Sequence, residues 1–458
     1  MDSTLACLAA WMPRQRWYAA KGRPPSLRLV SWWDPPPSDE DPDAQVRTFL
    51  VADEGALPAV LYQIPVVSRA TETVEALPQH IIGSPEPGTT FIDGPFDPAY
   101  ARALVRLVTR GGDGRGPSMV AAGHPTRHVP PDEPRTASVL TGEQSNTSLI
   151  FRSSGMPIIC KVYRQLHPGL NPDIELPTAL ADAGSPHVPR AIGWIEGRWP
   201  DSATAQGTVT GSLAAAQEFL PEVEDAWRVA LRAAAHGEDF SERAHALGTA
   251  TADVHVLLAG LFPTRPSLAT DRDATAETWR RRLTIAIAEV PAIADRREAI
   301  EGVYRSAHAI EWPPLQRVHG DYHLGQVLQV PGRGWVLLDF EGEPLRPMAE
   351  RTRPDLALRD VAGMLRSFDY VSGSIRLDNP DRSPEAVRDW AARARRAFLE
   401  GYAQTTGADL DALSPLLAAL ELDKAVYEAI YEARNRPTWV SIPLGAIGRL
   451  VERPTPVT

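Results

Sequence analysis

The sequence predicts an α+β protein in which a strand-rich N-terminal half precedes a mostly helical C-terminal half. Short apolar or alternating runs bounded by turn residues, typical of strands, recur between residues 27 and 219. After Pro221, apolar residues recur at helical spacing in six long segments. Segment 111–135, rich in Gly, Pro and Arg, reads as a linker. We therefore expect three parts, at 1–95, 96–220 (including that linker) and 221–458.

The first part is predicted to be a small α+β domain. An apolar run at 5–11 predicts a helix at its start, and a second helix at 98–109, opened by Pro98, follows the domain. Strands are predicted at 27–33, 46–51 and 57–66. The acidic, Pro-rich segment 34–43 between the first two strands must form a loop.

Five further strands and six long helices complete the expected fold. The strands are predicted at 137–140, 148–152, 158–163, 191–195 and 213–219. The helices are predicted at 225–235, 241–258, 274–290, 356–370, 384–405 and 410–433. This order indicates a bilobal arrangement, with a sheet in the first lobe and helices in the second.

Composition and charge narrow the class of protein. The 458 residues include 43% hydrophobic and 23% charged residues, as in ordinary soluble globular proteins. The net charge of −11 argues against a nucleic-acid partner, because phosphate backbones need a basic surface. Two cysteines form no disulfide framework and fit a reducing compartment. We see no signal-peptide pattern and no apolar run long enough for a membrane span, so we expect a cytoplasmic protein.

Two acidic motifs carry most of the functional information. Residues 319–326 read His-Gly-Asp-Tyr-His-Leu-Gly-Gln, and residues 338–341 read Leu-Asp-Phe-Glu. Each motif follows an apolar run suited to a strand, at 315–318 and 335–338. Their spacing matches the protein-kinase pattern H-R-D-x-x-x-x-N followed by D-F-G. The sequence therefore favours a phosphotransferase site, and a protein-kinase-like fold, over two carboxylates that merely cap turns.

Each polar residue of these motifs takes a role in phosphoryl transfer. Asp321 is placed to accept the proton of an acceptor hydroxyl, and Asp339 to hold the Mg²⁺ that bridges ATP phosphates. Gln326 stands where kinases have a metal-binding Asn, and its amide oxygen can still coordinate the ion. Glu341 is close enough to Asp339 to help with a second ion. His323 is predicted to lie in the acceptor site. A zinc site at His319 and His323 is disfavoured, because two histidines alone provide too few ligands.

Contacts to ATP are predicted in the strand-rich part. Lys161 lies where kinases have a phosphate-binding Lys, and Glu175 is the carboxylate expected to hold it. The polar loop before and at the second strand has no glycine-rich motif, but its hydroxyls, amides and backbone N–H groups suit phosphate oxygens. Its candidate residues are Gln144, Ser145, Asn146, Thr147 and Ser148. Backbone groups of Glu218 and Leu220, where the fifth strand ends, are expected to contact adenine.

A polar and aromatic helix face near the C-terminus is the predicted acceptor site. Four residues share this face at i, i+3, i+4 and i+7, namely Lys424, Tyr427, Glu428 and Tyr431. Charged groups suit sugar hydroxyls, and aromatic rings suit sugar faces. The alternative is a helix that packs its Tyr residues into the core while Lys and Glu reach solvent. Further acceptor contacts are expected at Glu432, Arg434 and Trp439.

These stretches resemble one family, the bacterial maltokinases, which make maltose 1-phosphate from maltose and ATP. The similar segments are 13–23, 142–148, 161–175, 319–326, 338–347, 358–370 and 422–444. The resemblance implies a bilobal protein-kinase-like fold with an additional N-terminal cap domain, and ATP and Mg²⁺ as cofactors. It implies phosphorylation of the anomeric hydroxyl of maltose, in a pathway from trehalose to α-glucan. It also suggests trehalose synthase as a partner.

Two other functions stay open at this point. A related small-molecule kinase could act on glucosamine or an aminoglycoside. Such cationic acceptors need several converging carboxylates, whereas the predicted helix face mixes Glu428 and Glu432 with basic residues. A non-catalytic pseudokinase scaffold is the other alternative, disfavoured because the chain retains Asp321 and Asp339. The sequence is compatible with either a monomer or a dimer.

Overall fold

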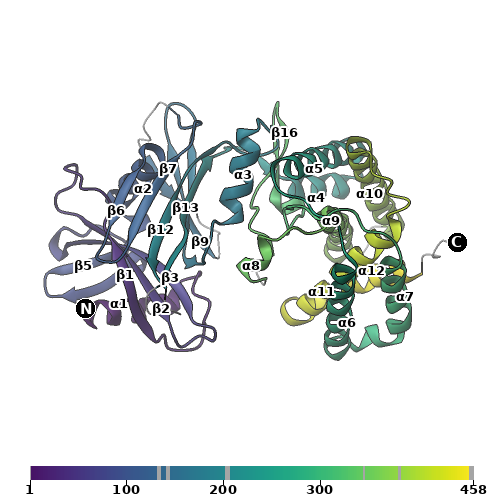
Figure 1. The fold of residues 1–458 in the computed structure, drawn as a ribbon, viewed down its shortest axis with the longest axis horizontal. Helices are drawn as coiled ribbons and strands as arrows, with labels where there is room; N and C mark the ends of the chain where they lie inside the picture. Colours follow the sequence, from purple (N-terminus) through teal and green to yellow (C-terminus); the bar gives the residue numbers. More distant parts are fainter. Residues whose placement is uncertain are drawn as a thin grey trace. The chain divides into compact units, whose positions relative to one another are not determined.

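The computed structural model describes residues 2–130, 136–140, 145–201, 207–343, 346–379 and 383–452. Contacts divide the chain into two units, one comprising residues 1–178 and 189–221, the other residues 179–188 and 222–458. The first unit holds two β-sheets and the second is mostly helical, as the labels in Figure 1 show. None of the described helices is both long enough and apolar enough to span a membrane.

The first sheet of unit 1 is antiparallel, in the order β1-β2-β3-β5-β4. Its strands are β1 Leu27–Trp33, β2 Gln45–Asp53, β3 Val60–Ala70, β4 Ile81–Glu86 and β5 Thr89–Asp93. Helix α1 (Asp2–Trp11) lies against β4. The three predicted strands are confirmed, and β4 and β5 are additional. Trp11, Trp17 and Tyr62 fill the core under this sheet.

The second sheet of unit 1 is also antiparallel, in the order β6-β7-β12-β13-β10-β9-β8. Its strands are β6 Gly112–Arg115, β7 Val120–Pro125, β8 Thr136–Val139, β9 Asn146–Arg152, β10 Ile158–Tyr163, β12 Ala191–Pro200 and β13 Thr208–Glu218. The last five correspond to the five strands predicted for this part, which are therefore confirmed.

The predicted linker at 111–135 is wrong for residues 112–125, where β6 and β7 extend the second sheet. Two glycines of this segment, Gly116 and Gly123, mark close backbone packing rather than flexibility. A Cβ atom on Gly116 would lie 1.6 Å from the carbonyl oxygen of Trp32, and one on Gly123 would lie 2.1 Å from that of Leu107. A glycine-rich composition is therefore a poor guide here, because it has the same appearance in a loop and in a crowded strand.

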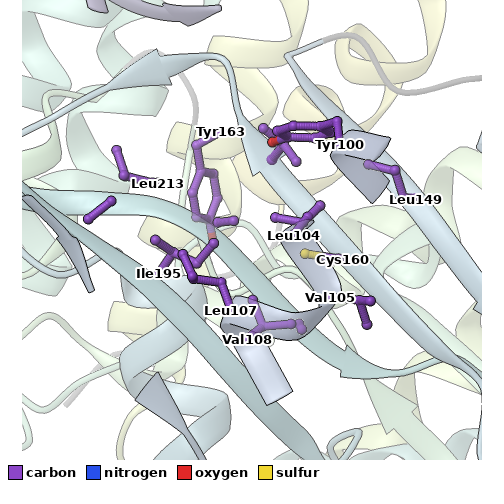
Figure 2. Close-up of a cluster of buried hydrophobic side chains, with 14 of the residues drawn as sticks. Tyr100, Leu104, Val105, Leu107, Val108, Leu149, Cys160, Tyr163, Ile195 and Leu213 are labelled. Atoms are coloured by element: carbon purple, nitrogen blue, oxygen red, sulfur yellow. The ribbon is translucent and has the colours of Figure 1, made fainter. Parts of the chain in front are cut away.

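Helix α2 (Pro98–Arg110) supplies one side of the core of the second sheet. Asp97 caps the helix, since its carboxylate accepts a hydrogen bond of 2.8 Å from the N–H of Ala99. Apolar residues of α2, among them Leu104 and Val108, lie in the same buried cluster as Cys160 of β10, as Figure 2 shows. This packing holds the central strands of the sheet against a helix that was predicted from the sequence.

Polar contacts join the two sheets of unit 1. The short strand β11 (Gln165–Leu166), which follows β10, pairs with β3 of the first sheet. The buried side-chain amide of Gln63 on β3 donates to the carbonyl oxygens of Tyr163 (2.6 Å) and Leu213 (2.5 Å) in the second sheet. The first sheet is therefore bonded to the strand that carries Lys161, rather than tethered to it by a linker.

Unit 2 is built from helices and one small sheet. The helices are α4 Ala226–His236, α5 Ser241–Leu261, α6 Ala269–Glu289, α7 Arg297–His308, α8 Met348–Arg351, α9 Ala357–Asp378, α10 Pro384–Thr406, α11 Ser414–Asn435 and α12 Ser441–Val451. The sheet contains β14 Glu224–Asp225, β15 Val327–Val330 and β16 Gly334–Leu337. Helix α3 (Pro172–Asp182) crosses the sequence boundary between the units.

All six predicted helices of this part are confirmed, while α7, α8 and α12 are additional. The strand predicted before the first acidic motif is wrong. Residues 315–318 make only isolated bridges, from Leu315 to Arg265 and from Gln316 to Asp355. The segment remains single because its neighbours are loop residues that provide no second strand. The run before the second motif does form a strand, β16.

Candidate active site

The loop that carries Asp321 is braced by a buried carboxylate. Asp360, on the first turn of α9, accepts hydrogen bonds from the backbone N–H groups of His319 (2.8 Å) and Gly320 (2.9 Å). His255 of α5 contacts the same carboxylate at 3.0 Å. Burial opposes the charge of Asp360, but these contacts outweigh burial and lower its pKa. Asp321 therefore lies on a loop whose backbone is held by a charged group.

His319 ties this loop to the second acidic motif. Its Nε2 atom lies 2.8 Å from the carbonyl oxygen of Leu338, and its Nδ1 atom accepts a hydrogen bond of 3.4 Å from the N–H of Asp321. This pattern fits a neutral ring protonated at Nε2. The two motifs that are separated in sequence are thus adjacent in unit 2.

Asp339 has an unusual backbone conformation. Its φ of +64° lies in the left-handed region, which Asp and Asn tolerate better than most residues. Strained conformations of this kind cluster at functional sites. The side chain of Gln326 donates a hydrogen bond of 3.0 Å to Asp339, so the two predicted metal ligands are in contact.

A divalent cation fits the oxygen atoms gathered here. A carboxylate oxygen of Asp339 and one of Glu341 lie within 4.8 Å of each other, and both side chains are partly exposed. Hard cations such as Mg²⁺ take carboxylate and amide oxygens as ligands. Because the amide nitrogen of Gln326 faces Asp339, coordination through its oxygen requires the amide to rotate.

Lys424 of α11 lies beside the predicted proton acceptor. Its Nζ atom is 2.8 Å from Glu343 and 3.7 Å from Asp321. Burial disfavours its charge, but the two carboxylates outweigh burial and raise the pKa of Lys424. For Glu343, burial is likewise outweighed by Lys424 and Arg346, which lower its pKa to about 2. Lys424 and Glu343 are therefore charged at neutral pH, and the side chain of Asp321 beside them is 24% exposed.

His323, two residues after Asp321, is partly buried. Its Nδ1 atom accepts a hydrogen bond of 3.0 Å from the N–H of Gly325. Burial lowers the pKa of His323, although Asp321 acts in the opposite direction. The ring is therefore neutral at pH 7 and can contact an uncharged hydroxyl without adding charge.

Two other predicted acceptor residues of α11, Glu428 and Glu432, contact residues of α9. Glu428 binds buried Arg366 of α9 at 2.7 Å, and Glu432 accepts from Tyr370 of α9 at 3.0 Å. Burial raises the pKa of Glu428, although Arg366 opposes this. Both carboxylates therefore link α11 to α9 in addition to any contact with a ligand.

Aromatic rings gather close to these carboxylates. Tyr370 and Trp439 are stacked, with ring centroids 6.3 Å apart. Tyr431 is 45% exposed, and the guanidinium of Arg436 lies near both its ring and that of Trp439. Tyr427 is partly buried below the ammonium of Lys424. The expected aromatic surface is thus present, and it includes Tyr370, which the sequence reasoning missed.

Arg434 lies at an exposed position on α11. It forms an ion pair with Glu289 at the end of α6. Arg434 follows Tyr427 by seven residues, so the two residues share one side of the helix at 3.6 residues per turn. Its role as an acceptor ligand stays a prediction.

Unit 1 positions the predicted phosphate-binding lysine. Lys161 of β10 forms an ion pair of 3.1 Å with Asp173 in the first turn of α3. The expected partner was Glu175, two residues further along the same helix. Asp173 and Glu175 both lie in the first turn of α3, and Asp173 makes the ion pair of 3.1 Å. A carboxylate in the first turn is also favoured by the helix dipole.

The five residues predicted to bind phosphate, 144–148, lie before and at the start of β9. Gln144 lies outside the described residues, and Ser145 is exposed. Ser148 pairs with Lys161 across the strands and Asn146 pairs with Tyr163, so both share the face of Lys161.

Thr147 belongs to the opposite face of β9. Its hydroxyl is buried and accepts a hydrogen bond of 2.9 Å from Arg164. The prediction that the hydroxyl of Thr147 binds phosphate is therefore corrected, because this hydroxyl already binds Arg164. A phosphate contact through its backbone N–H stays a prediction.

The predicted adenine contacts lie at the end of β13. The N–H of Glu218 donates to the carbonyl oxygen of Arg190 (2.8 Å), and the N–H of Phe219 donates to that of Pro157 (2.8 Å). These two amides are committed to the sheet. A contact to adenine through the carbonyl of Glu218 or the backbone of Leu220 stays a prediction.

Several site residues carried no clear signal in the sequence. Glu343, Asp173 and Arg366 appear as ordinary charges in polar or amphipathic segments. One signal for Arg366 was available: it interrupts an otherwise apolar stretch of α9, and a buried charge needs a partner. The partners themselves come from other helices and are visible only after folding.

Two known family models match this chain, one in its N-terminal part and one in the rest. The maltokinase N-terminal cap domain matches residues 11–97. The phosphotransferase enzyme family matches residues 136–416. The predicted fold class, a kinase-like α+β fold with an N-terminal cap domain and a helical C-terminal region, is confirmed.

Relatives of the chain are known from sequence and structure. A glucosamine kinase of Streptacidiphilus jiangxiensis is 33% identical over 364 residues, covering 73% of this chain and 80% of that protein. A glucosamine kinase of Mycolicibacterium smegmatis is 29% identical over 333 residues, covering 69% and 80%. A solved glucosamine kinase in complex with glucosamine, ADP and inorganic phosphate is 27% identical, with a TM-score of 0.70, covering 97% of this chain and 98% of that one.

Proposed function

Since the chain belongs to the phosphotransferase enzyme family, we propose that it transfers the γ-phosphoryl group of ATP to the anomeric hydroxyl of maltose. The products are maltose 1-phosphate and ADP. The match of residues 11–97 to the maltokinase cap domain supports this acceptor. The solved relative with bound ADP supports a nucleotide as the donor.

The transfer proceeds in line, without a phosphorylated enzyme. Asp321 orients the anomeric hydroxyl and accepts its proton as the bond from sugar oxygen to phosphorus forms. The bond between the γ-phosphorus and the bridging oxygen breaks, and ADP leaves with the electron pair. Asp339, Gln326 and Glu341 would hold a Mg²⁺ ion, which would neutralise phosphate charge when bound. Lys161, with Asn146, Ser145 and Ser148, binds phosphate oxygens.

The observation that carries the choice of a neutral sugar is the position of Lys424. Its ammonium lies between Glu343 and Asp321, so two carboxylates and one ammonium occupy this part of the site. An amino sugar would bring a second cation toward the ammonium that already lies beside both carboxylates. Like charges this close repel, and a neutral acceptor avoids that repulsion.

The aromatic surface supports an acceptor larger than one sugar ring. Tyr427 lies next to Lys424, and the stacked pair of Tyr370 and Trp439 provides further ring faces. The C–H faces of pyranose rings pack well on aromatic rings. A disaccharide can engage both places, whereas a monosaccharide engages one of them.

The second candidate is a glucosamine kinase. The relatives at 33% and 29% identity carry that name, and this is the observation in its favour. Glu428 and Glu432 provide carboxylates that an amino sugar would need, but Arg366 and Arg436 already bind them. The pathway from trehalose to α-glucan and a trehalose synthase partner remain parts of the maltose proposal.

The deciding experiment measures ADP release with ATP and Mg²⁺ for a panel of maltose, glucose, glucosamine, trehalose and kanamycin. Asp321→Asn serves as the control that separates catalysed transfer from contaminating activity. Turnover with maltose that is lost in this variant supports the proposal. Turnover with glucosamine alone replaces maltose by the second candidate. Binding of ATP without turnover of any acceptor would favour the alternative of a non-catalytic pseudokinase scaffold.

A further inference from the structure

Arg164 is a completely buried arginine that contacts three separate segments of unit 1. Its Nη2 atom lies 2.9 and 3.0 Å from the two carboxylate oxygens of Asp93, where β5 of the first sheet ends. Its Nε atom donates a hydrogen bond of 2.9 Å to the hydroxyl of Thr147 on β9. Its guanidinium carbon also lies 4.9 Å from the ring centroid of Trp17. One side chain therefore links the first sheet of unit 1, which belongs to the cap domain, to the second sheet, which carries Lys161.

Stability alone is a weak reason to bury such a group. The desolvation of two buried charges offsets most of their attraction, and apolar side chains of similar volume often replace buried ion pairs without loss of stability. What an arginine adds is geometry, because its planar guanidinium fixes several partners in set directions. The contacts of Arg164 to Asp93 and Thr147 are of this directional kind.

Thr147 connects Arg164 to the predicted phosphate site. Thr147 lies between Asn146 and Ser148, the two residues of β9 that share the face of Lys161. A strand is stiff over such a distance, so holding the side chain of Thr147 also holds the two residues beside it. Arg164 itself follows Lys161 by three residues. The same arginine thus fixes both strands that carry predicted phosphate ligands.

We propose that Arg164 is a positioning residue for ATP, which sets Asn146 and Ser148 relative to Lys161 by clamping Thr147 to Asp93 of the cap. The cap domain therefore contributes to nucleotide affinity without touching the nucleotide. The inference rests on the part of the proposed function that concerns ATP and is independent of the acceptor.

Thr147→Val is the sharpest test, because it keeps the size and branching of the side chain while removing the hydroxyl that Arg164 binds. Its effect is measured as MgATP affinity by calorimetric titration, without any acceptor, and as the KM values for ATP and acceptor. We expect affinity for MgATP to fall by roughly five- to tenfold, which is the size expected for the loss of one typical hydrogen bond. The acceptor KM is expected to remain unchanged.

Two variants control for simple loss of packing. Thr48→Val makes the same change in a strand of the first sheet, at a buried hydroxyl without a hydrogen-bond partner among the described residues, and should leave MgATP affinity unchanged. Thr147→Ser retains the hydroxyl and should restore affinity to within about twofold of the wild type. A merely structural role for Thr147 would lower the melting temperature without this selective effect on ATP.

Asp93→Asn tests the cap end of the clamp and serves if Thr147→Val fails to fold. It should weaken MgATP binding in the same direction while leaving the acceptor KM unchanged. Wild-type affinity for MgATP in folded Thr147→Val or folded Asp93→Asn would overturn the inference, as would equal changes in both KM values. Failure of the wild-type protein to bind MgATP would instead contradict the proposed function itself.

Discussion

The ammonium of Lys424 lies 2.8 Å from a carboxylate oxygen of Glu343, and this pair stands beside the predicted proton acceptor. On the proposed function, a cationic group of an acceptor would meet this ammonium beside Asp321. We therefore expect the pair to influence the choice of acceptor through charge.

We expect Lys424→Met to change acceptor preference. Removal of the ammonium leaves two carboxylates without their cation, so kcat/KM for maltose should fall by about 10- to 100-fold, while the ratio of glucosamine to maltose activity rises. Steady-state rates with both acceptors measure this. Arg280→Met, at an exposed position on α6, is the matched control and should behave as wild type. An unchanged preference in Lys424→Met would contradict this role.

Asp339→Asn should separate charge from backbone conformation. Asn tolerates the positive φ that Asp339 adopts, so the fold should be retained. Loss of one metal-binding charge is expected to reduce kcat by roughly 10³-fold and to raise the Mg²⁺ concentration needed for half-maximal activity. A Mg²⁺ titration of the rate provides the measurement. Exposed Asp389→Asn controls for the substitution, and a normal Mg²⁺ dependence in Asp339→Asn would exclude Asp339 as a ligand.

Asp360→Asn should reduce stability in a manner that depends on pH. The pKa of Asp360 is lowered in the folded state, whereas the unfolded value is about 3.9. The unfolded chain therefore takes up the proton first as pH falls. The stabilising contribution is complete above the unfolded value and disappears as pH falls through the folded value.

Urea unfolding between pH 3.5 and 7 measures this contribution. The variant should be less stable than the wild type by about 2–3 kcal/mol near pH 7, because the backbone N–H groups of His319 and Gly320 lose a charged acceptor. The difference between the two proteins should shrink below about pH 4. A difference that is constant over this range would show that the charge of Asp360 is not involved.

Gln63→Leu should destabilise unit 1. The side-chain amide of Gln63 satisfies two buried carbonyl groups, those of Tyr163 and Leu213, and Leu cannot replace either bond. A loss of about 2–3 kcal/mol in the free energy of unfolding is expected from chemical denaturation. Gln45→Leu, at an exposed position on β2, is the control and should change stability by less than about 0.5 kcal/mol. Equal stability of the two variants would refute the role of Gln63.

The sequence predicted the residues of the two acidic motifs more accurately than the residues that contact Lys161 and Thr147. Spacing alone placed Asp321, Gln326 and Asp339 in one site, because kinase chemistry demands these residue types at those intervals, and Gln326 does contact Asp339. The identity of the carboxylate that holds Lys161 was missed by two residues, since either Asp173 or Glu175 suits a short helix and only packing decides between them. Thr147 was misassigned because alternation along a strand follows its register, and the register was unknown.

The same limit explains the error in the region around residues 112–125. Local composition predicts flexibility for Gly116 and Gly123, yet both are required by backbone atoms of residues far away in the sequence. Helices of unit 2 were predicted more reliably, because 3.6-residue periodicity is a local property. Contacts that join distant segments, such as those of Arg366 with Glu428, have no local signature.

The contact between Gln63 and Leu213 spans 150 residues, and this has a consequence for how the protein is made. A ribosome that adds about 5–20 residues per second needs roughly 8–30 s to produce the chain between them. During that interval the newly emerged cap sheet holds a polar amide that has yet to meet its carbonyls, and a strand edge, on β3, that still lacks β11. Slow translation through residues 64–213 would therefore lengthen the period in which the nascent chain is most prone to aggregate.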